Sequence, residues 1–343
     1  MVKFGTECCL RKYRAYTYLG ARAVAATRGR AALRNSLTPS VMSGGWLQLE
    51  AQGGLCDRKR ASGSYEEGKI GMIEAGGLLK GKRGLVLGVA NNRSIAWGIA
   101  KAAHDHGAEL AFTYQGDALK KRVEPLAAEL NALVVGHCDV TDGASIDAVF
   151  AEVEKQWGKL DFLVHAIGFS DKDELTGRYV DTTEGNFSKT MLISVYSLTA
   201  VTQRAEKLMT DGGSVLTLTY YGAEKVMPNY NVMGVAKAAL EASVQYLAVD
   251  LGPKNIRVNA ISAGPIKTLA ASGIGDFRYI LKWNEYNAPL RRTVTTEEVG
   301  DSGVYFLSDL SRAVTGEVHH VDSGYHVVGM KAVDAPDISV IKD

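Results

Sequence analysis

From residue 84 to residue 321 the chain alternates short apolar runs with longer mixed stretches, and this alternation limits its possible folds more than any other feature. The short runs predict buried strands, and the stretches of ten or more residues between them predict helices. Seven strands are expected, at residues 84–88, 109–113, 133–135, 160–165, 214–219, 256–261 and 317–321. Strands that alternate with helices favour an α/β fold with a doubly wound, seven-stranded parallel sheet.

Ligands of such sheets bind beyond the carboxyl ends of the strands. The residues at or just beyond the expected strand ends are Gly88, Gln115, Asp139, Ile167, Tyr220 and Ile266. Because these ends meet along one edge of a parallel sheet, the sequence predicts a single binding site there.

The first of these strand ends has the form of a nucleotide-binding turn. The strand ends at Gly88, a short loop follows, and a helix is expected to open at Ser94. A helix N-terminus presents unpaired N–H groups and the positive end of its dipole, which suits a pyrophosphate. Ser94 stands where a glycine would often be, and its hydroxyl is expected to cap the helix and to face a phosphate. A helix-capping turn that holds no ligand is the alternative that this pattern alone leaves open.

Tyr230 and Lys237 form a second motif. They are seven positions apart on an expected helix, almost two turns, so both side chains should leave one face about 10 Å apart along the axis. A phenol can hydrogen-bond a carbonyl on which negative charge develops, and an ammonium can hold hydroxyls and lower the pKa of the phenol. The other interpretation is a core tyrosine and a solvated lysine, but the nucleotide-binding turn upstream favours the functional one.

Composition excludes several classes of protein. Of the 343 residues 46% are apolar, enough for a large core, and no run of 18 or more apolar residues suggests a membrane span. Residues 1–71 carry 12 Lys and Arg against 5 Asp and Glu, whereas residues 72–343 carry 27 against 33, so the body gives no argument for nucleic-acid binding. Only Cys138 of the four cysteines lies in the body, where no disulfide partner exists, and a cytoplasmic location is expected.

The first 71 residues form a basic leader without sustained periodicity. Four arginines with interleaved alanines between residues 22 and 34 would suit a helix that targets an organelle. The favoured interpretation is a start codon assigned too far upstream, since Met72 runs directly into the first strand. The expected organisation is a disordered or removed leader at 1–71, one α/β domain at 72–330 and a tail at 331–343.

Longer stretches make the chain similar to one family. They are Gly88-Val89-Ala90, Ser94-Ile95-Ala96, Ala166-Ile167-Gly168-Phe169, Tyr220-Tyr221-Gly222-Ala223-Glu224, and the runs from Tyr230 to Lys237 and from Ser262 to Ala270. From about Met72 to Met330 the chain resembles the NADH-dependent enoyl-acyl-carrier-protein reductases of bacterial type II fatty acid synthesis, a divergent group of short-chain dehydrogenases/reductases. The resemblance implies a single Rossmann-type domain with a substrate-binding lid insertion, assembled as a cytoplasmic homotetramer. The leader has no counterpart in the family.

The implied reaction is the reduction of the trans-2 double bond of an enoyl thioester carried on acyl carrier protein, during fatty acid elongation. Tyr220, Tyr230 and Lys237 are the implied catalytic residues. The resemblance places Tyr230 at the thioester carbonyl, Lys237 at the ribose hydroxyls of the nicotinamide half, and Tyr220 in the wall of the acyl pocket. A phenol at the thioester oxygen would stabilise the enolate charge where it develops.

The resemblance also implies a set of binding residues. The implied cofactor contacts are Gly88, Ser94, Ile95, Gln115, Asp139, Val140, Ile167, Gly168, Lys237, Ile266, Lys267, Thr268, Leu269 and Ala270. The implied substrate contacts are Ser170, Tyr220, Tyr230, Met233, Ile274 and Phe277. The second strand ends in Thr113-Tyr114-Gln115 without an arginine for a 2′-phosphate, so NADH is favoured over NADPH, although no acidic residue marks the ribose there.

Two other functions remain as alternatives. A 3-ketoacyl or other carbonyl reductase of the superfamily would place its tyrosine and lysine four positions apart, with a serine near the end of the fifth strand. Here the spacing is seven, and Thr219 supplies the hydroxyl in that region. A non-catalytic nucleotide-sensing protein on the same scaffold would be favoured by loss of Tyr230 or Lys237, and both are present.

The segment 268–287 carries Phe277, Tyr279 and Ile280, which would suit plain helix packing. Because the segment follows Ile266 at a strand end, a flexible lid over an apolar acyl chain is the favoured interpretation.

No metal site, nucleic-acid contact or membrane contact is expected. The pairs His104/His106 and His319/His320 lack the i,i+4 spacing that puts two ligands on one helix face, and no cysteine pair joins them. Lys120-Lys121-Arg122 is predicted to be a solvated helix face, and docking of an acidic carrier protein there has no further support.

Overall fold

The computed structural model describes residues 77–269 and 271–338, which lie within one compact unit of the chain, Lys69–Asp343. Outside the described residues lie the expected leader (1–71), residues 72–76, Ala270 and residues 339–343.

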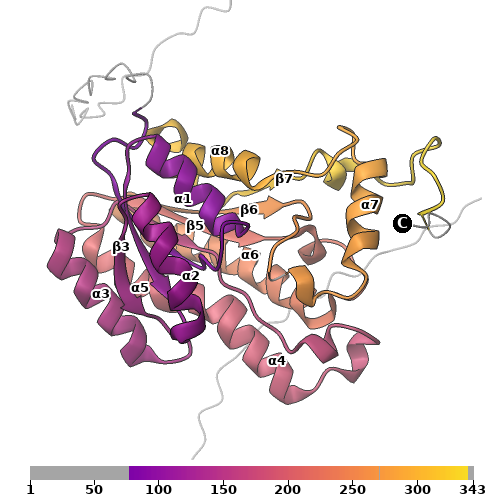
Figure 1. The fold of residues 1–343 in the computed structure, drawn as a ribbon, viewed down its shortest axis with the longest axis horizontal. Coiled ribbons are helices and arrows are strands. Elements are labelled where there is room, and N and C mark those ends of the chain that lie inside the picture. Colours follow the sequence, from indigo (N-terminus) through magenta and orange to yellow (C-terminus); the bar gives the residue numbers. More distant parts are fainter. Residues whose placement is uncertain (1–76, 270, 339–343) are drawn as a thin grey trace, which may run out of the picture. The chain divides into compact units, whose positions relative to one another are not determined.

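A seven-stranded parallel sheet forms the centre of the described part (Figure 1), which confirms the fold class predicted from the alternation. Its strands are β1 (Arg83–Leu87), β2 (Glu109–Tyr114), β3 (Leu133–His137), β4 (Phe162–His165), β5 (Gly213–Thr219), β6 (Ile256–Ala263) and β7 (Val318–Val321). Their order is β3-β2-β1-β4-β5-β6-β7, and every neighbouring pair is parallel. The chain order therefore reverses between β1 and β4, which is where doubly wound sheets bind ligands.

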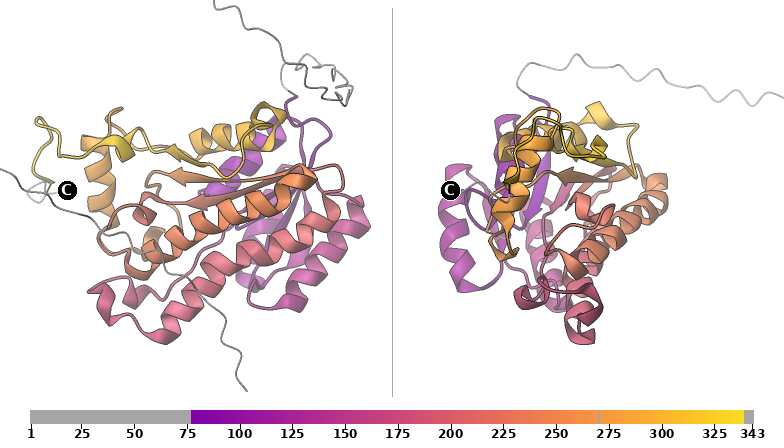
Figure 2. Two further views of the ribbon diagram at one scale, coloured as in Figure 1. Left: turned by 180° about the vertical axis from the view of Figure 1, so that it is seen from behind. Right: turned by 90° about the vertical axis from the view of Figure 1, so that its right-hand side faces the viewer.

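Helices cover both faces of this sheet (Figure 2). The longer ones are α1 (Ile95–Asp105), α2 (Gly116–Glu129), α3 (Gly143–Trp157), α4 (Glu184–Met191), α5 (Ser197–Leu208), α6 (Asn231–Leu251), α7 (Phe277–Asn287) and α8 (Thr296–Leu307). One buried cluster joins α1, α2 and α8 to the sheet, and a second joins α3, α5 and α6 to the opposite face.

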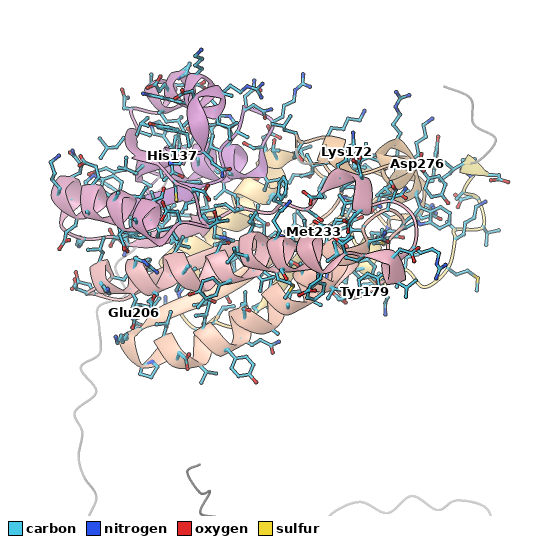
Figure 3. All side chains as sticks on the ribbon, turned by 90° about the horizontal axis from the view of Figure 1, so that it is seen from below. His137, Lys172, Tyr179, Glu206, Met233 and Asp276 are labelled. Carbon is cyan, nitrogen blue, oxygen red and sulfur yellow. The ribbon has the colours of Figure 1, made fainter. Side chains whose placement is uncertain are left out.

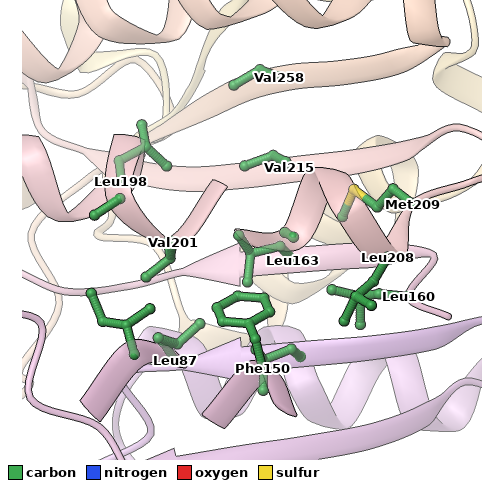
Figure 4. Close-up of a cluster of buried hydrophobic side chains, with 14 of the residues drawn as sticks. Leu87, Phe150, Leu160, Leu163, Leu198, Val201, Leu208, Met209, Val215 and Val258 are labelled. Atoms are coloured by element: carbon green, nitrogen blue, oxygen red, sulfur yellow. The ribbon is translucent and has the colours of Figure 1, made fainter. Parts of the chain in front are cut away.

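The second cluster is the larger body of core side chains (Figure 4). Leu163, Val215 and Val258 come from β4, β5 and β6 and are fully buried, as is Leu198 of α5, and Phe150 of α3 is nearly so. Each such side chain contributes about 2 kcal/mol through the apolar surface that it removes from water. Alternate residues of the same strands point to the other face, so a strand buried on both sides reads as a continuous apolar run.

Glycines allow α1 and α8 to approach closely. A Cβ atom at Gly98 of α1 would lie 2.3 Å from the carbonyl oxygen of Thr296, and one at Gly300 of α8 would lie 2.5 Å from the carbonyl oxygen of Gly98. Larger residues would push the two helices apart. The contact fixes the axis of α1, whose N-terminus faces the site described below.

α6 with the turn that follows it (Asn231–Lys254) is long and apolar enough to cross a membrane by length and composition alone, since an 18-residue stretch within it has a mean hydropathy of 1.2. Leu240, Val244 and Leu251 pack this helix into the core against the sheet. These contacts account for part of its apolar character, while Tyr246 and Val249 of the same helix are exposed. α6 ends before Gly252, where a 3₁₀ turn with Pro253 follows.

Candidate active site

The turn from β1 into α1 forms one wall of the site. Gly88 has a φ of +101°, and a Cβ atom there would lie 2.1 Å from the carbonyl oxygen of Ala166, so only glycine fits. The hydroxyl of Ser94 donates to the carbonyl of Asn91 at 2.6 Å and accepts from the N–H of Ala90 at 3.4 Å. The prediction that this hydroxyl caps α1 is wrong, because it is turned back into the loop, although Ser94 does occupy the N-cap position. The first turn of α1 has no side-chain cap, which leaves its N–H groups for a ligand.

Tyr230 lies at the entry of α6 rather than within the helix. Asn229 and Asn231 have φ values of +56° and +29°, and the helix begins at Asn231 with Tyr230 as its N-cap. The prediction that one helix carries both residues is therefore wrong for Tyr230, which lies one position before α6, because the left-handed residues turn the chain there. Both side chains nevertheless line the same cavity.

The rings of Tyr220 and Tyr230 pack edge to face, with centroids 5.1 Å apart. Burial raises the pKa of Tyr230, and Tyr220 and Glu241 raise it further. Burial also raises the pKa of Tyr220, whose buried hydroxyl has no hydrogen-bond partner among the described residues. Both phenols keep their protons at neutral pH and can act as donors. The expectation that Lys237 lowers the pKa of the phenol is wrong, since burial in apolar surroundings dominates.

Lys237 is 9% exposed, and its Nζ donates to the carbonyl of Leu218 at 2.7 Å. Burial lowers the pKa of Lys237 to about 8, and the charge of Glu241 works against this decrease. A Cβ atom at Gly168 would lie 3.8 Å from Nζ, so the amine lies beside the backbone that follows β4. Lys237 therefore presents a donor between the ends of β4 and β5.

These elements enclose a cavity of about 520 Å³, a size typical of small-molecule and cofactor sites. The predicted site residues in its lining are Gly88, Ser94, Ile95, Ile167, Gly168, Ser170, Tyr220, Tyr230, Met233, Lys237, Ile266, Thr268, Leu269, Ile274 and Phe277. Figure 3 labels two of the lining residues, Lys172 and Met233. Both lie on the right of that view, as does Asp276, which precedes α7, whereas His137 lies on the left. The turn of β1, the end of β5 and the entries of α6 and α7 thus meet around one space.

Other predicted cofactor contacts are absent from this lining. They are Gln115, Asp139, Val140 and Lys267, while Ala270 is not among the described residues. Gln115 and Asp139 follow the neighbouring strands β2 and β3, and hydrogen bonds from the Thr141 hydroxyl and N–H, at 2.7 and 2.9 Å, lower the pKa of Asp139. Val140 packs in the core, which leaves only its backbone for a ligand. The roles of these residues remain predictions.

A π-helical turn, η3 (Leu192–Tyr196), joins α4 to α5 and positions a residue that the sequence analysis missed. The Ser194 hydroxyl accepts from the N–H of Phe169 at 2.9 Å and lies 3.0 Å from the Phe169 carbonyl, to which it can donate. Ser194 thereby fixes the loop after β4 that lines the cavity. Such turns often occur at functional sites, but no residue pattern marks them in a sequence.

His165, at the end of β4, is a second residue that was missed. It is fully buried, and its Nδ1 and Nε2 pair with the hydroxyls of Thr217 and Ser197 at 3.0 and 2.8 Å. Burial lowers the pKa of His165 to about 3, and the charge of Lys237 contributes in the same direction. The ring is therefore neutral and links β4, β5 and α5 as a structural group.

Ser170 is held by a small polar network. The buried Asn186 accepts from the N–H of Asp171 at 2.9 Å and donates to the hydroxyl of Ser170 at 3.2 Å. The hydroxyl of Thr190 donates to the same oxygen at 2.9 Å. Since its hydroxyl is engaged in this way, Ser170 would meet a substrate mainly through its backbone.

The predicted lid segment contains a short 3₁₀ turn, η6 (Ala271–Gly273), followed by α7. Ile274 and Phe277 line the cavity, whereas Ile280 is buried and Tyr279 stacks on Trp283. The segment thus has features of both interpretations, a lid and plain helix packing. Its first part faces the cavity, and its second part packs as a helix. Whether the segment moves remains a prediction.

The pair His319/His320 is engaged in other contacts. His320 pairs with Glu224 at 2.6 Å, and His319 packs edge to face against Phe306. Within residues 77–269 and 271–338, no group of three or more His, Cys, Asp or Glu side chains is arranged to hold a metal ion.

Comparisons with known proteins agree with this arrangement. The family model described as Enoyl-(Acyl carrier protein) reductase matches residues 88–326. The chain is 78% identical over 272 residues to enoyl-[acyl-carrier-protein] reductase [NADH] 1 of Rhizobium meliloti, an alignment that covers 79% of this chain and 100% of the relative. It is 64% identical over 259 residues to the second such reductase of that organism, covering 76% and 97%.

A solved structure is similar as well. The enoyl-(acyl-carrier-protein) reductase of Anaplasma phagocytophilum, determined in complex with NAD, is 60% identical and superposes with a TM-score of 0.73. The match covers 78% of this chain and 100% of that one.

Proposed function

The chain belongs to the enoyl-(acyl carrier protein) reductase family, and on that premise we propose that it reduces the trans-2 double bond of enoyl thioesters carried on acyl carrier protein, with NADH as the reductant. The proposal rests on one observation: Tyr220, Tyr230 and Lys237 line the same cavity as the β1–α1 turn.

Features of the cavity support a dinucleotide. Gly88 allows the end of β1 to approach the Ala166 backbone closely, and the N-terminus of α1 after this turn has no side-chain cap, which suits a pyrophosphate. Lys237 would hold the ribose hydroxyls, and the small Gly168 beside its amine leaves space for them. NADH, when bound, supplies a hydride for the β-carbon of the enoyl thioester. The protein residues bind and orient both reactants and exclude water around them.

Tyr230 is the proposed donor to the thioester oxygen. As the β-carbon accepts hydride, negative charge develops on that oxygen, and a buried phenol that keeps its proton can stabilise it. The apolar surroundings strengthen this hydrogen bond because little water screens it. Loss of one such donor typically costs about 3–4 kcal/mol in the transition state. Tyr220, in edge-to-face contact with Tyr230, is proposed to line the acyl pocket, and its hydroxyl has no hydrogen-bond partner within residues 77–269 and 271–338.

One contact weighs against the carbonyl-reducing alternative. Thr219 supplies the hydroxyl near the end of β5, where a carbonyl reductase would use a serine. In this chain that hydroxyl donates to the carboxylate of Glu241 at 2.6 Å. It is therefore committed to a protein group rather than offered to a substrate carbonyl.

The proposed assembly is a homotetramer in the cytoplasm, without nucleic-acid or membrane partners. Support for assembly comes from large apolar side chains left exposed on one helix: Tyr246 and Val249 of α6 are 76% and 77% exposed. Exposed apolar side chains gathered on a helix are typical of subunit contacts.

The proposed activity is tested by following the oxidation of NADH and of NADPH with a crotonyl-type thioester and with an acetoacetyl-type thioester. We expect NADH to be consumed with the enoyl substrate and little consumption with the keto substrate. Faster consumption with the acetoacetyl-type thioester would contradict the proposal and favour a carbonyl reductase. No consumption with either, despite measurable NADH binding, would favour a nucleotide-sensing protein.

A further inference from the structure

Glu241 lies one helical turn after Lys237 on α6, close to the site but absent from the cavity lining. Its Oε1 accepts a hydrogen bond of 2.6 Å from the hydroxyl of Thr219, the last residue of β5. Residues four apart share a helix face, so Glu241 and Lys237 approach the end of β5 from the same side.

Two consecutive residues of β5 are therefore tied to one face of α6. Lys237 donates to the carbonyl of Leu218, and Glu241 accepts from the hydroxyl of Thr219. The next residue is Tyr220, whose ring packs on Tyr230. A displacement of the strand end would shift both phenols of the site.

Charge gives Glu241 a second role. Lys237 is buried, and its one direct hydrogen bond in the described part of the chain is to a neutral carbonyl. A buried ammonium is costly unless an opposite charge lies nearby. Glu241 is the group whose negative charge favours the ammonium form of Lys237.

We propose that Glu241 is a positioning residue of the active site, which anchors the end of β5 through Thr219 and supplies the negative charge that balances Lys237. The inference rests on the proposed function, in which Lys237 binds the cofactor. Glu241 touches neither reactant in this account and acts through the two residues that it holds.

The titratable groups that face this pair are Glu224, His320 and His165. Burial raises the pKa of Glu241 and Glu224 adds to the increase, whereas the Thr219 hydroxyl, His320 of β7 and Lys237 oppose it. Glu224 is itself paired with His320. On the side of β4, the neutral His165 brings no charge to Lys237.

Removal of the Glu241 carboxylate should lower the pKa of Lys237. Burial lowers the pKa of Lys237 to about 8 while Glu241 works against that decrease, so removing the carboxylate charge lowers it further. The ammonium form exists below this pKa and is lost as the pH rises through it. The pH range over which Lys237 stays charged should therefore end at a lower pH in a variant without the charge.

The experiment measures the acetylation rate of Lys237 by acetic anhydride as a function of pH, with mass spectrometry, in the full chain without cofactor. Only the neutral amine reacts, so the midpoint of the profile reports the pKa of Lys237. Glu241→Gln keeps the size of the side chain and an oxygen for Thr219, and its midpoint should fall by roughly one pH unit. Glu224→Gln, the same change in a neighbouring carboxylate, should leave the midpoint where it is.

NADH titration of the same proteins across the pH range gives a second readout. In Glu241→Gln, the loss of affinity with rising pH should begin at a correspondingly lower pH. If the acetylation midpoint shifts but the pH dependence of NADH binding does not, the role of Glu241 is supported. The same result would show that Lys237 is not the cofactor ligand.

An acetylation midpoint of Glu241→Gln equal to that of the unchanged protein overturns the proposal, as does an equal shift in Glu224→Gln. If Glu241→Gln does not fold, Glu241→Met removes the charge without leaving a polar group to bury, and the same downward shift is expected. Thr219→Val should lower turnover, because the strand end loses its anchor.

Discussion

Burial sets the protonation of the functional side chains at neutral pH. Tyr220 and Tyr230 keep their protons because apolar surroundings disfavour phenolates, and the same effect lowers the pKa of Lys237 to about 8. Motif and spacing bring the tyrosines and the lysine into one site, and that much could be predicted from the sequence. The direction of the shift at Tyr230 could not, because it depends on which residues from distant segments exclude water from the ring.

Tyr230→Phe tests whether the Tyr230 hydroxyl donates to the thioester oxygen. Turnover should fall by about 10²–10³-fold because the developing charge loses a hydrogen bond, while NADH affinity should change little. Steady-state kinetics with an enoyl thioester and fluorescence titration with NADH measure the two effects. Tyr305→Phe on α8, outside the cavity lining, is the matched control and should behave like the unchanged protein. Full turnover in Tyr230→Phe would refute the assignment.

NADH binding should also report the titration of Lys237. The ammonium is present below its pKa, so affinity should hold at lower pH and weaken as the pH rises through about 8. Lys237→Ala should bind NADH weakly at every pH and lack this transition. Lys254→Ala, at an exposed residue just after α6, should keep the transition. Unchanged NADH affinity in Lys237→Ala would mean that Lys237 is not the ribose ligand.

The regular strands and helices could be predicted from the sequence, because apolar periodicity reports burial directly. The irregular start of α6 and the π-helical turn could not be predicted. The start of α6 depends on Asn231, whose Nδ2 donates to the carbonyls of Glu174 and Thr176, more than 50 positions earlier in the chain. The π-helical turn that carries Ser194 is fixed by contact with Phe169. Interactions between distant segments decide both, and local patterns do not contain them.

The segment 268–287 gives a prediction at the element scale. Its amides should exchange with solvent quickly in the protein alone and slowly with NADH and an acyl-site ligand bound, because covering an acyl chain buries Ile274 and Phe277. Hydrogen exchange with mass spectrometry measures this, and α8 serves as an internal reference that should be protected in both states. Strong and equal protection of the segment in both states would make it a fixed core element.

For the whole molecule, the reversal of strand order between β1 and β4 decides where the site can form. The turn after β1 and the loops after β4, β5 and β6 all open at this edge, and the cavity lies among them. The alternation of strands and helices, with right-handed crossovers, was enough to predict this placement. The extent of the cavity was not predictable, because it depends on how loops of different length meet.

We expect the leader, residues 1–71, to be dispensable for stability and turnover. A chain that begins at Met72 should match the full-length chain in melting temperature and turnover, since residues 1–71 show no periodicity that would pack against a folded domain. Calorimetry and the enoyl thioester assay compare the two chains. A decrease in melting temperature of more than about 5 °C on truncation would show that the leader stabilises the fold.

Transfer of the hydride from NADH to the enoyl thioester can be followed directly with an isotope. NADH carrying deuterium at both C4 positions is incubated with the protein and a trans-2-enoyl thioester, and the product is analysed by mass spectrometry and NMR. We expect a saturated thioester with one deuterium at the β-carbon, formed rapidly by the unchanged protein and far more slowly by Tyr230→Phe. Absence of deuterium from the β-carbon, or a saturated product formed equally fast by both proteins, would contradict it.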